Sequence, residues 1–209
     1  RESKRIPRVN WRVKSPMQSL HLCHNIIPML VIFHALVCSI AASCSTMSQQ
    51  ACLGDLELYG TSGGYDDGSL ALLDARLNGV DQSYDDSWTS RGFNIVVFDS
   101  QTHQVTKEEN FDIYQSSNES AALAKALIDI PECSILVLLA NDAHDFWDLS
   151  RSNLGSDVAD TLSTRYGATK FRGITSYRDS YGLISSPGRS SPYAEVTSTG
   201  GEGAVTLSS

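Results

Sequence analysis

The apolar run SILVLLA at residues 134–140 constrains the fold of this chain more than any other segment. A strand of this composition has no polar face to turn to water, so the run predicts a fully buried strand. Such a strand needs a core around it, and residues 52–184 are enough chain to bury one. The composition, 41% hydrophobic and 19% charged, is that of an ordinary globular protein. We therefore expect a single compact domain over residues 52–184.

Patterned segments on both sides of this run predict further strands. The dipeptide Asn78-Gly79 tolerates positive φ and is typical of a tight hairpin turn, so a strand is expected on each side of it. Residues 94–99 (NIVVFD) are apolar and β-branched, as strands are. Other strands are expected near Val105, at Phe111–Tyr114 and at about Tyr177–Ile184.

Two segments have the end signals of helices. Ser116 and Glu119 form a capping box before an apolar stretch that Pro131 ends. A second helix is expected over residues 157–165, with Ser156 as its cap and Gly167 just beyond its end. Because strands outnumber helices and do not alternate strictly with them, the fold class is α+β.

The first fifty residues resemble a targeting segment. Residues 26–42 contain no Lys, Arg, Asp or Glu and are followed by small residues, which is the pattern of a signal-peptide core. A leader over residues 17–43, cleaved between residues 40 and 45, follows if translation starts at Met17, and residues 1–16 are then a basic arm outside it. The alternative is an uncleaved type II anchor with the basic arm in the cytoplasm. After cleavage no stable membrane span is expected.

Other features are typical of a secreted glycoprotein. Asn118 begins the sequon Asn-Glu-Ser in a polar stretch, where we expect a surface loop. Cys44 and Cys52 enclose a short polar loop and are expected to form a disulfide, which leaves Cys133 unpaired as a small buried residue. Residues 185–209 are rich in Ser, Gly, Thr and Pro without periodicity and predict a disordered tail.

The charge distribution argues against nucleic acid as a partner. Residues 1–51 carry six Lys or Arg and one Glu, so the net charge of −8 becomes −13 over residues 52–209. Nucleic-acid affinity comes largely from neutralising phosphates with basic side chains, and such a surface would repel them.

An ordered set of short motifs resembles the interleukin-like epithelial–mesenchymal-transition-inducer family, also called PANDER-like. The family pattern is an R-G-[I/L]-N strand, an F-D step, a helix, a strand ending in an acidic residue, another helix, and an R-D-x-[W/Y] strand. All of these occur in order across residues 90–184. The matching segments are Arg91–Val97 (RGFNIVV), Phe111–Tyr114 (FDIY), the run SILVLLA, Asn141–Ala143 (NDA) and Tyr177–Tyr181 (YRDSY).

The resemblance implies a fold of two packed β-sheets flanked by short helices. The family occurs in small secreted cytokine-like factors, in the sugar-binding stem of a Golgi O-mannose N-acetylglucosaminyltransferase, and in large cell-surface hyaluronan-processing proteins. The secreted factors carry a further cysteine just after the R-D-x-W strand, whereas this chain has Gly182-Leu183-Ile184 there. The resemblance therefore implies a sugar-binding module more than a cytokine-like factor.

The same motifs supply the candidate site residues. Carried over from the family pattern, Asp142 and Arg178 are the candidates for hydrogen bonds to sugar hydroxyls, because charged groups bind them in pairs. The stacking candidates are Trp147, Tyr177 and Tyr181, whose flat rings suit the C–H face of a sugar. The structural alternative is an ion pair in which Arg178 holds Asp142 or Asp112 in place. Arg91, at the start of a strand, is interpreted as structural.

No catalytic motif is present, and no cofactor is expected. His144, Asp145 and Asp148 follow Asp142 at a spacing that could bind a divalent metal, but an acid-rich loop in an acidic protein is the better interpretation, so we expect no metal. The sequence therefore predicts a secreted, non-catalytic module that binds a glycan or an extracellular protein. The alternatives are a cytokine-like factor with a protein receptor and, as a third hypothesis, a metal-dependent hydrolase.

Overall fold

The computed structural model describes residues 53–82, 90–143, 154–174 and 178–209, all of which belong to one compact unit. The basic arm, the leader and the cysteines 44 and 52 lie outside the described residues. Within the part of the chain that is described, no helix is long and apolar enough to cross a membrane.

The described residues contain one β-sheet of nine strands, with every pairing but one antiparallel. The strands are β1 (Leu56–Gly63), β2 (Leu70–Leu77), β3 (Val80–Gln82), β4 (Gly92–Asp99), β5 (Val105–Phe111), β6 (Ser134–Asn141), β7 (Ser180–Ser185), β8 (Ala194–Ser198) and β9 (Val205–Ser208). Two helices, α2 (Ser117–Asp129) and α3 (Ser156–Tyr166), complete the α+β fold.

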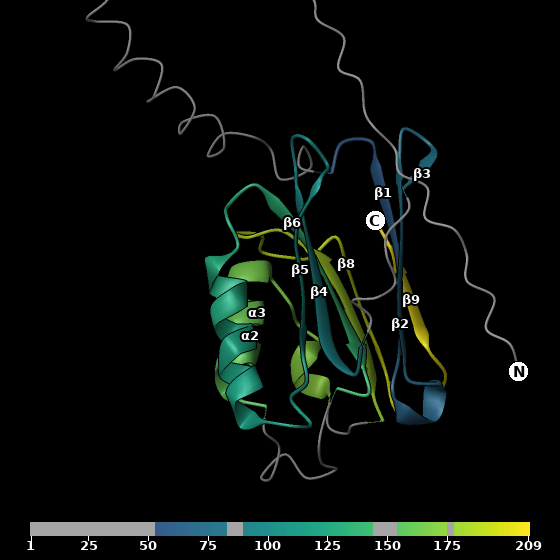
Figure 1. The fold of residues 1–209 in the computed structure, drawn as a ribbon, viewed down its shortest axis with the longest axis vertical. Coiled ribbons are helices and arrows are strands. Elements are labelled where there is room, and N and C mark those ends of the chain that lie inside the picture. The colour runs from purple at the N-terminus through teal and green to yellow at the C-terminus, as the bar shows by residue number, and fades with distance from the viewer. Residues whose placement is uncertain (1–52, 83–89, 144–153, 175–177) are drawn as a thin grey trace, which may run out of the picture. The chain divides into compact units, whose positions relative to one another are not determined.

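The sheet consists of two halves. Five strands run in the order β5-β4-β6-β7-β8, and four run in the order β3-β2-β1-β9. A single parallel bridge between Gly63 and Asn141 joins the halves, so the structure has one continuous sheet where two packed sheets were expected. The halves nevertheless face one another (Figure 1).

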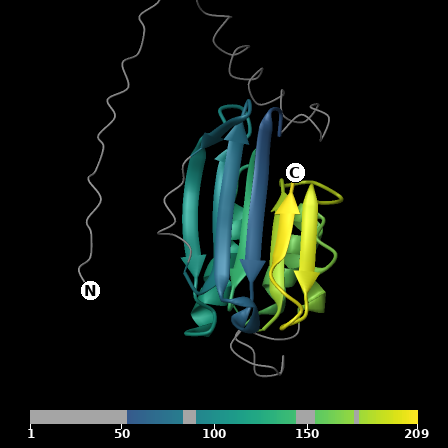
Figure 2. The same ribbon diagram turned by 90° about the vertical axis from the view of Figure 1, so that its right-hand side faces the viewer.

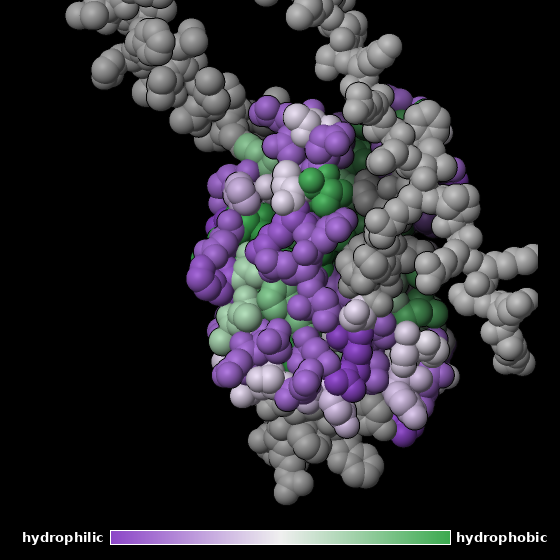
Figure 3. Space-filling view, viewed as in Figure 1, coloured by the Kyte–Doolittle hydropathy of each residue, from purple (hydrophilic) through white to green (hydrophobic). Residues whose placement is uncertain are grey.

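Three layers follow from this arrangement, with the five-stranded half in the middle. The helices cover one of its faces and the four-stranded half covers the other (Figure 1, Figure 2). The central strand β6 shows the consequence: Leu136 and Leu138 belong to the core beneath the helices, while Val137 and Leu139 belong to the core between the halves. All eight residues of β6 are buried, which confirms the fully buried strand that its composition predicts. Polar residues make up most of the described surface in Figure 3.

The predicted hairpin is confirmed, and the edge strand β5 differs from expectation. Asn78 and Gly79 both have positive φ, at 54° and 73°, and join β2 to β3. Residues 105–111 form one strand instead of two short ones. The apolar pattern predicted an interruption at Lys107 and the two glutamates that follow it. These polar residues are tolerated because β5 is an edge strand of the five-stranded half and is paired on one side only.

Both helices form where expected, with different details at their ends. The Ser116 side chain accepts a hydrogen bond from the backbone N–H of Asn118, so it caps α2 as predicted. Gly155, and not Ser156, is the residue before α3, while Gly167 ends that helix with φ 70°. The sequon residue Asn118 is exposed, but it lies in the first turn of α2 and not in a loop.

The predicted disordered tail at residues 185–209 is wrong. Strand β8 pairs with β7, and β9 pairs with β1 at the other end of the sequence. Leu207 is buried in the core between the halves. The two strands are only five and four residues long, which is too short to show a clear apolar period within a segment rich in Ser, Gly and Thr. The domain therefore extends to Ser208, beyond the predicted boundary at residue 184.

Cys133 is disulfide-bonded, so the expectation that it is unpaired is also wrong. It lies just before the buried strand β6 with φ 60°, and its carbonyl oxygen accepts hydrogen bonds from the backbone and side chain of Ser100. Its partner is outside the described residues.

Candidate functional site

Three charged residues meet at one end of the five-stranded half. Arg91 immediately precedes β4, Asp112 follows β5, and Asp142 follows β6. Strand β4 is antiparallel to both neighbours, with Phe93 opposite Phe111 and Gly92 opposite Asn141. The start of β4 therefore lies between the ends of β5 and β6, which places the three side chains together.

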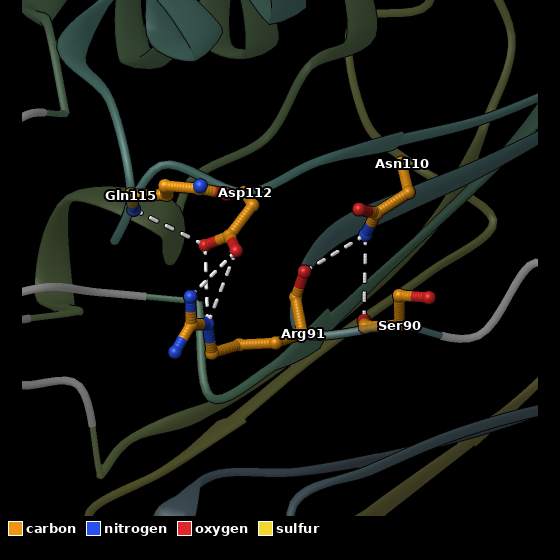
Figure 4. Close-up of polar contacts among 5 residues, drawn as sticks. All are labelled: Ser90, Arg91, Asn110, Asp112 and Gln115. Carbon is orange, nitrogen blue, oxygen red and sulfur yellow. Dashed lines mark hydrogen bonds and ion pairs between the residues drawn. The ribbon is translucent and has the colours of Figure 1, made fainter.

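Arg91 and Asp112 form a two-pronged ion pair (Figure 4). The Nη2 of Arg91 lies 2.6 Å from Oδ2 of Asp112, and its Nε lies 3.1 Å from Oδ1. The backbone N–H of Gln115 donates to the same carboxylate at 3.2 Å. The guanidinium also stacks on the exposed ring of Tyr114, at 4.4 Å from the ring centre. Arg91 is thus held in one orientation by a carboxylate and an aromatic ring.

The backbone beneath Arg91 is fixed by asparagine side chains. The amide of Asn110 donates to the carbonyl oxygen of Arg91 at 3.0 Å and, at 3.4 Å, to that of Ser90 (Figure 4). Buried Asn94 donates to the carbonyl of Ser90 at 2.9 Å, so the Asn of the R-G-x-N motif is a positioning residue. Gly92 has φ 115°, a conformation that a side chain at this position would strain.

Asp142 combines a strained backbone with a buried carboxylate oxygen that has no hydrogen-bond partner. Its backbone has φ 47°, which is uncommon for a residue other than glycine. Its Oδ1 atom is buried without a hydrogen-bond partner. Burial raises the pKa of the Asp142 carboxyl above its ordinary value of 3.8, and of the two nearby charges Arg91 lowers it while Asp112 raises it. Strain of this kind clusters at functional sites.

The remaining predicted site residues are distributed differently. Arg178 binds Asp66 at 2.6 Å, and so neither Asp142 nor Asp112 is the carboxylate of this ion pair. Tyr181 is fully buried and donates to Glu195, which excludes it as a stacking surface. Trp147, Tyr177 and the loop residues His144, Asp145 and Asp148 lie outside the described residues. Among the residues that are described, no group of three or more His, Cys, Asp and Glu is arranged to hold a metal.

The sequence analysis interpreted Arg91 as structural and did not predict its contacts with Asp112 and Tyr114. The signal was present, since Arg91 opens the R-G-x-N motif and the other two belong to the F-D-x-Y motif. A charge at the start of a strand usually faces water, and only the antiparallel pairing of β4 with β5 shows that these two motifs lie side by side.

The motif residues at this sheet end coincide with a family match. The family model described as Interleukin-like EMT inducer matches residues 91–189. Residues 91–189 are therefore similar to the interleukin-like EMT inducer family. The match begins at Arg91 and contains Asp112, Asp142 and Arg178, whereas β1 to β3 and most of the C-terminal strands lie outside it. No curated protein matches the chain.

The raised pKa of Asp142 has a measurable consequence for the stability of this domain. The folded state holds the Asp142 proton more tightly than the unfolded state, so its contribution to stability falls as pH rises from 3.8 through the raised value. An asparagine has no such dependence. We expect Asp142→Asn to match the wild type in free energy of unfolding at pH 3 and to exceed it at pH 7, measured by urea denaturation at both pH values. An Asn variant that is less stable at pH 7 would contradict this.

Proposed function

We propose that this chain is a secreted, non-catalytic module that binds a carbohydrate at the sheet end formed by Arg91, Asp112 and Asp142. The observation that carries the proposal is the carboxylate of Asp142, which is partly buried beside an ion pair and has one oxygen without a partner. A buried acceptor left unsatisfied costs stability, and a ligand hydroxyl would satisfy it.

The neighbouring groups suit the remaining surface of a sugar. Nε and Nη2 of Arg91 donate to Asp112. The third nitrogen, Nη1, donates to no acceptor among the described residues and can donate to a ligand. A guanidinium and a carboxylate side by side offer donors and acceptors to adjacent hydroxyls. The exposed ring of Tyr114 offers a flat apolar surface for the C–H face. Arg178, on its own ion pair with Asp66, is the second candidate for a hydroxyl contact.

Secretion is supported by the leader-like segment and by the exposed sequon. The carboxamide of Asn118 lies on an exposed turn of α2, where an attached glycan would meet no core residue. Disulfides form and persist in oxidising compartments, so the disulfide of Cys133 fits the same route. The alternative, a type II anchor, also places the domain on the lumenal or extracellular side of the membrane.

A glycan array probed with the purified secreted domain tests the proposal. For a sugar that binds, we expect Arg91→Lys and Asp142→Asn each to weaken affinity about tenfold or more, since a point charge does not replace a planar fork and an amide does not replace a carboxylate. The melting temperatures should stay within about 3 °C of the wild type, because the Arg91–Asp112 pair is partly exposed.

Arg172→Lys provides the matched control. Arg172 also pairs with an aspartate, Asp160, but on an exposed surface of α3. The Arg172→Lys variant should leave glycan affinity unchanged. Arg178→Lys separates the two candidate arginines. A loss of glycan affinity in Arg178→Lys with none in Arg91→Lys would place the site at the Arg178–Asp66 ion pair. A wild-type protein that binds no glycan would instead favour the cytokine-like alternative with a protein receptor.

A further inference from the structure

The outer face of the four-stranded half carries a groove that the proposed glycan site does not use. Strand β1 lies between β2 and β9 on this face, with the helices behind the sheet (Figure 2). Alternate residues of β1 and β2 are exposed, and the others are buried in the core between the halves. The groove encloses about 500 Å³, and its main lining residues are Tyr59, Thr61, Leu72, Asp74, Arg76 and Thr206.

The strand register arranges these side chains in two neighbouring rows. Tyr59 lies opposite Asp74, and in the next row Thr61 lies between Leu72 and Thr206. Tyr59 and Leu72 are exposed large apolar side chains, at 38% and 48%. One row thus offers an aromatic ring beside a carboxylate, and the other offers an aliphatic side chain beside two hydroxyl groups.

The charge of this face is negative and partly uncompensated. Arg76 is paired with Asp81 at 2.6 Å, and Glu57 accepts a hydrogen bond from the hydroxyl of Tyr59. Asp74 makes no hydrogen bond or ion pair with any described residue, so its carboxylate can accept a ligand cation. The protein's own Arg76 already shows which cation suits this surface, because its guanidinium stands 5.7 Å from the centre of the Tyr59 ring.

We propose that this face binds a basic peptide segment in an extended conformation. A ligand arginine would pair with Asp74 beside the ring of Tyr59, combining an ion pair with a cation–π contact. An extended peptide that runs along the strands repeats its side chains on one face every second residue, about 7 Å apart, as the rows of the sheet do. The side chain two residues beyond the arginine would therefore contact Leu72. The ligand pattern is a basic residue, any residue, and then an aliphatic residue.

This site is independent of the glycan proposal. Tyr59, Leu72 and Asp74 all lie outside the segment that the family model matches, on a half of the sheet joined to the other by one bridge. Variants of Arg91 or Asp142 should therefore bind the peptide as the wild type does.

Fluorescence anisotropy with a labelled five-residue peptide tests the inference. The probe is acetylated and amidated, with arginine at position two, leucine at position four and threonine elsewhere. We expect Asp74→Asn and Tyr59→Ala each to weaken its binding about fivefold. A probe with glutamine in place of arginine should bind the wild type no more tightly than the arginine probe binds these variants. Raising the salt should weaken the wild-type interaction, because Asp74 is exposed.

Asp129→Asn is the matched control, since it removes the same charge from an exposed position on α2. It should change peptide affinity less than twofold. Equal losses in Asp74→Asn and Asp129→Asn would show attraction by net charge alone and overturn the site. Failure of the wild-type domain to bind the probe at low salt would also overturn the site. If the domain binds neutral oligosaccharides and Tyr59→Ala abolishes that binding, the face is a glycan site instead.

Discussion

Replacing Glu195 by alanine is expected to lower the free energy of unfolding by about 4 kcal/mol, because it leaves the buried hydroxyl of Tyr181 and three partly buried donors without an acceptor. The Glu195 carboxylate accepts hydrogen bonds from the backbone N–H and the hydroxyl of Thr169, at 2.8 and 3.0 Å. It also accepts from the N–H of Lys170 and the hydroxyl of Tyr181, both at 2.9 Å. Burial and this neighbouring carboxylate raise the pKa of Tyr181 well above its ordinary value.

An isosteric glutamine should rescue little of this loss. Oε1 and Oε2 of Glu195 each accept two hydrogen bonds, so an amide would direct its NH₂ group at one pair of donors. We expect Glu195→Gln to lose about 2 to 3 kcal/mol, measured by urea denaturation. Glu202→Gln is the control, because Glu202 accepts from one exposed N–H and should change stability by less than about 0.5 kcal/mol. Equal stability of the two glutamine variants would refute the structural role of Glu195.

The second large effect is expected for Gly92→Ala. A Cβ atom on Gly92 would lie 2.2 Å from the carbonyl oxygen of Phe111, and the backbone there has φ 115°. The clash is with the backbone of the paired strand β5, so no side-chain rotation relieves it. We expect a loss of about 3 kcal/mol or more in the free energy of unfolding, together with loss of the Arg91–Asp112 geometry.

Gly79→Ala separates the clash from the backbone strain. Gly79 also has positive φ, at 73°, but nothing lies within 4 Å of a Cβ built on it. Its substitution should therefore cost only about 1 kcal/mol, the price of the left-handed conformation alone. Equal free energies of unfolding for Gly92→Ala and Gly79→Ala would show that the close approach of β4 and β5 at Gly92 does not contribute to the loss of stability. Thermal and chemical denaturation of both variants would show the difference.

The sequence predicts those parts of the fold whose signals are local. The buried strand β6 follows from an unbroken apolar run, and the turn between β2 and β3 follows from Asn78-Gly79. Ser116 and Pro131 mark the ends of α2 closely. In each case a few adjacent residues determine the local conformation, so no knowledge of distant partners is needed.

The parts that sequence reasoning missed depend on distant contacts. Strand β9 pairs with β1, and its four residues are too few to indicate a strand by themselves. The same holds for the candidate site. The motif pointed to Asp142 as a candidate, but its neighbour Arg91 is 51 positions away and becomes apparent only from the pairing of β4 with β6. Which carboxylate each arginine binds depends on contacts between segments far apart in the sequence, as Arg178 with Asp66 shows.

The pairing of β9 with β1 also determines when the domain can finish folding. A ribosome releases β1 first among the described strands and β9 last, with every other element between them. Until β9 emerges, one edge of β1 is unpaired and the place of Leu207 in the core is empty. Contacts between segments this far apart form slowly. While residues 64–204 are synthesised, the nascent chain therefore has an open β1 edge, and this interval is when a chaperone would protect it from aggregation.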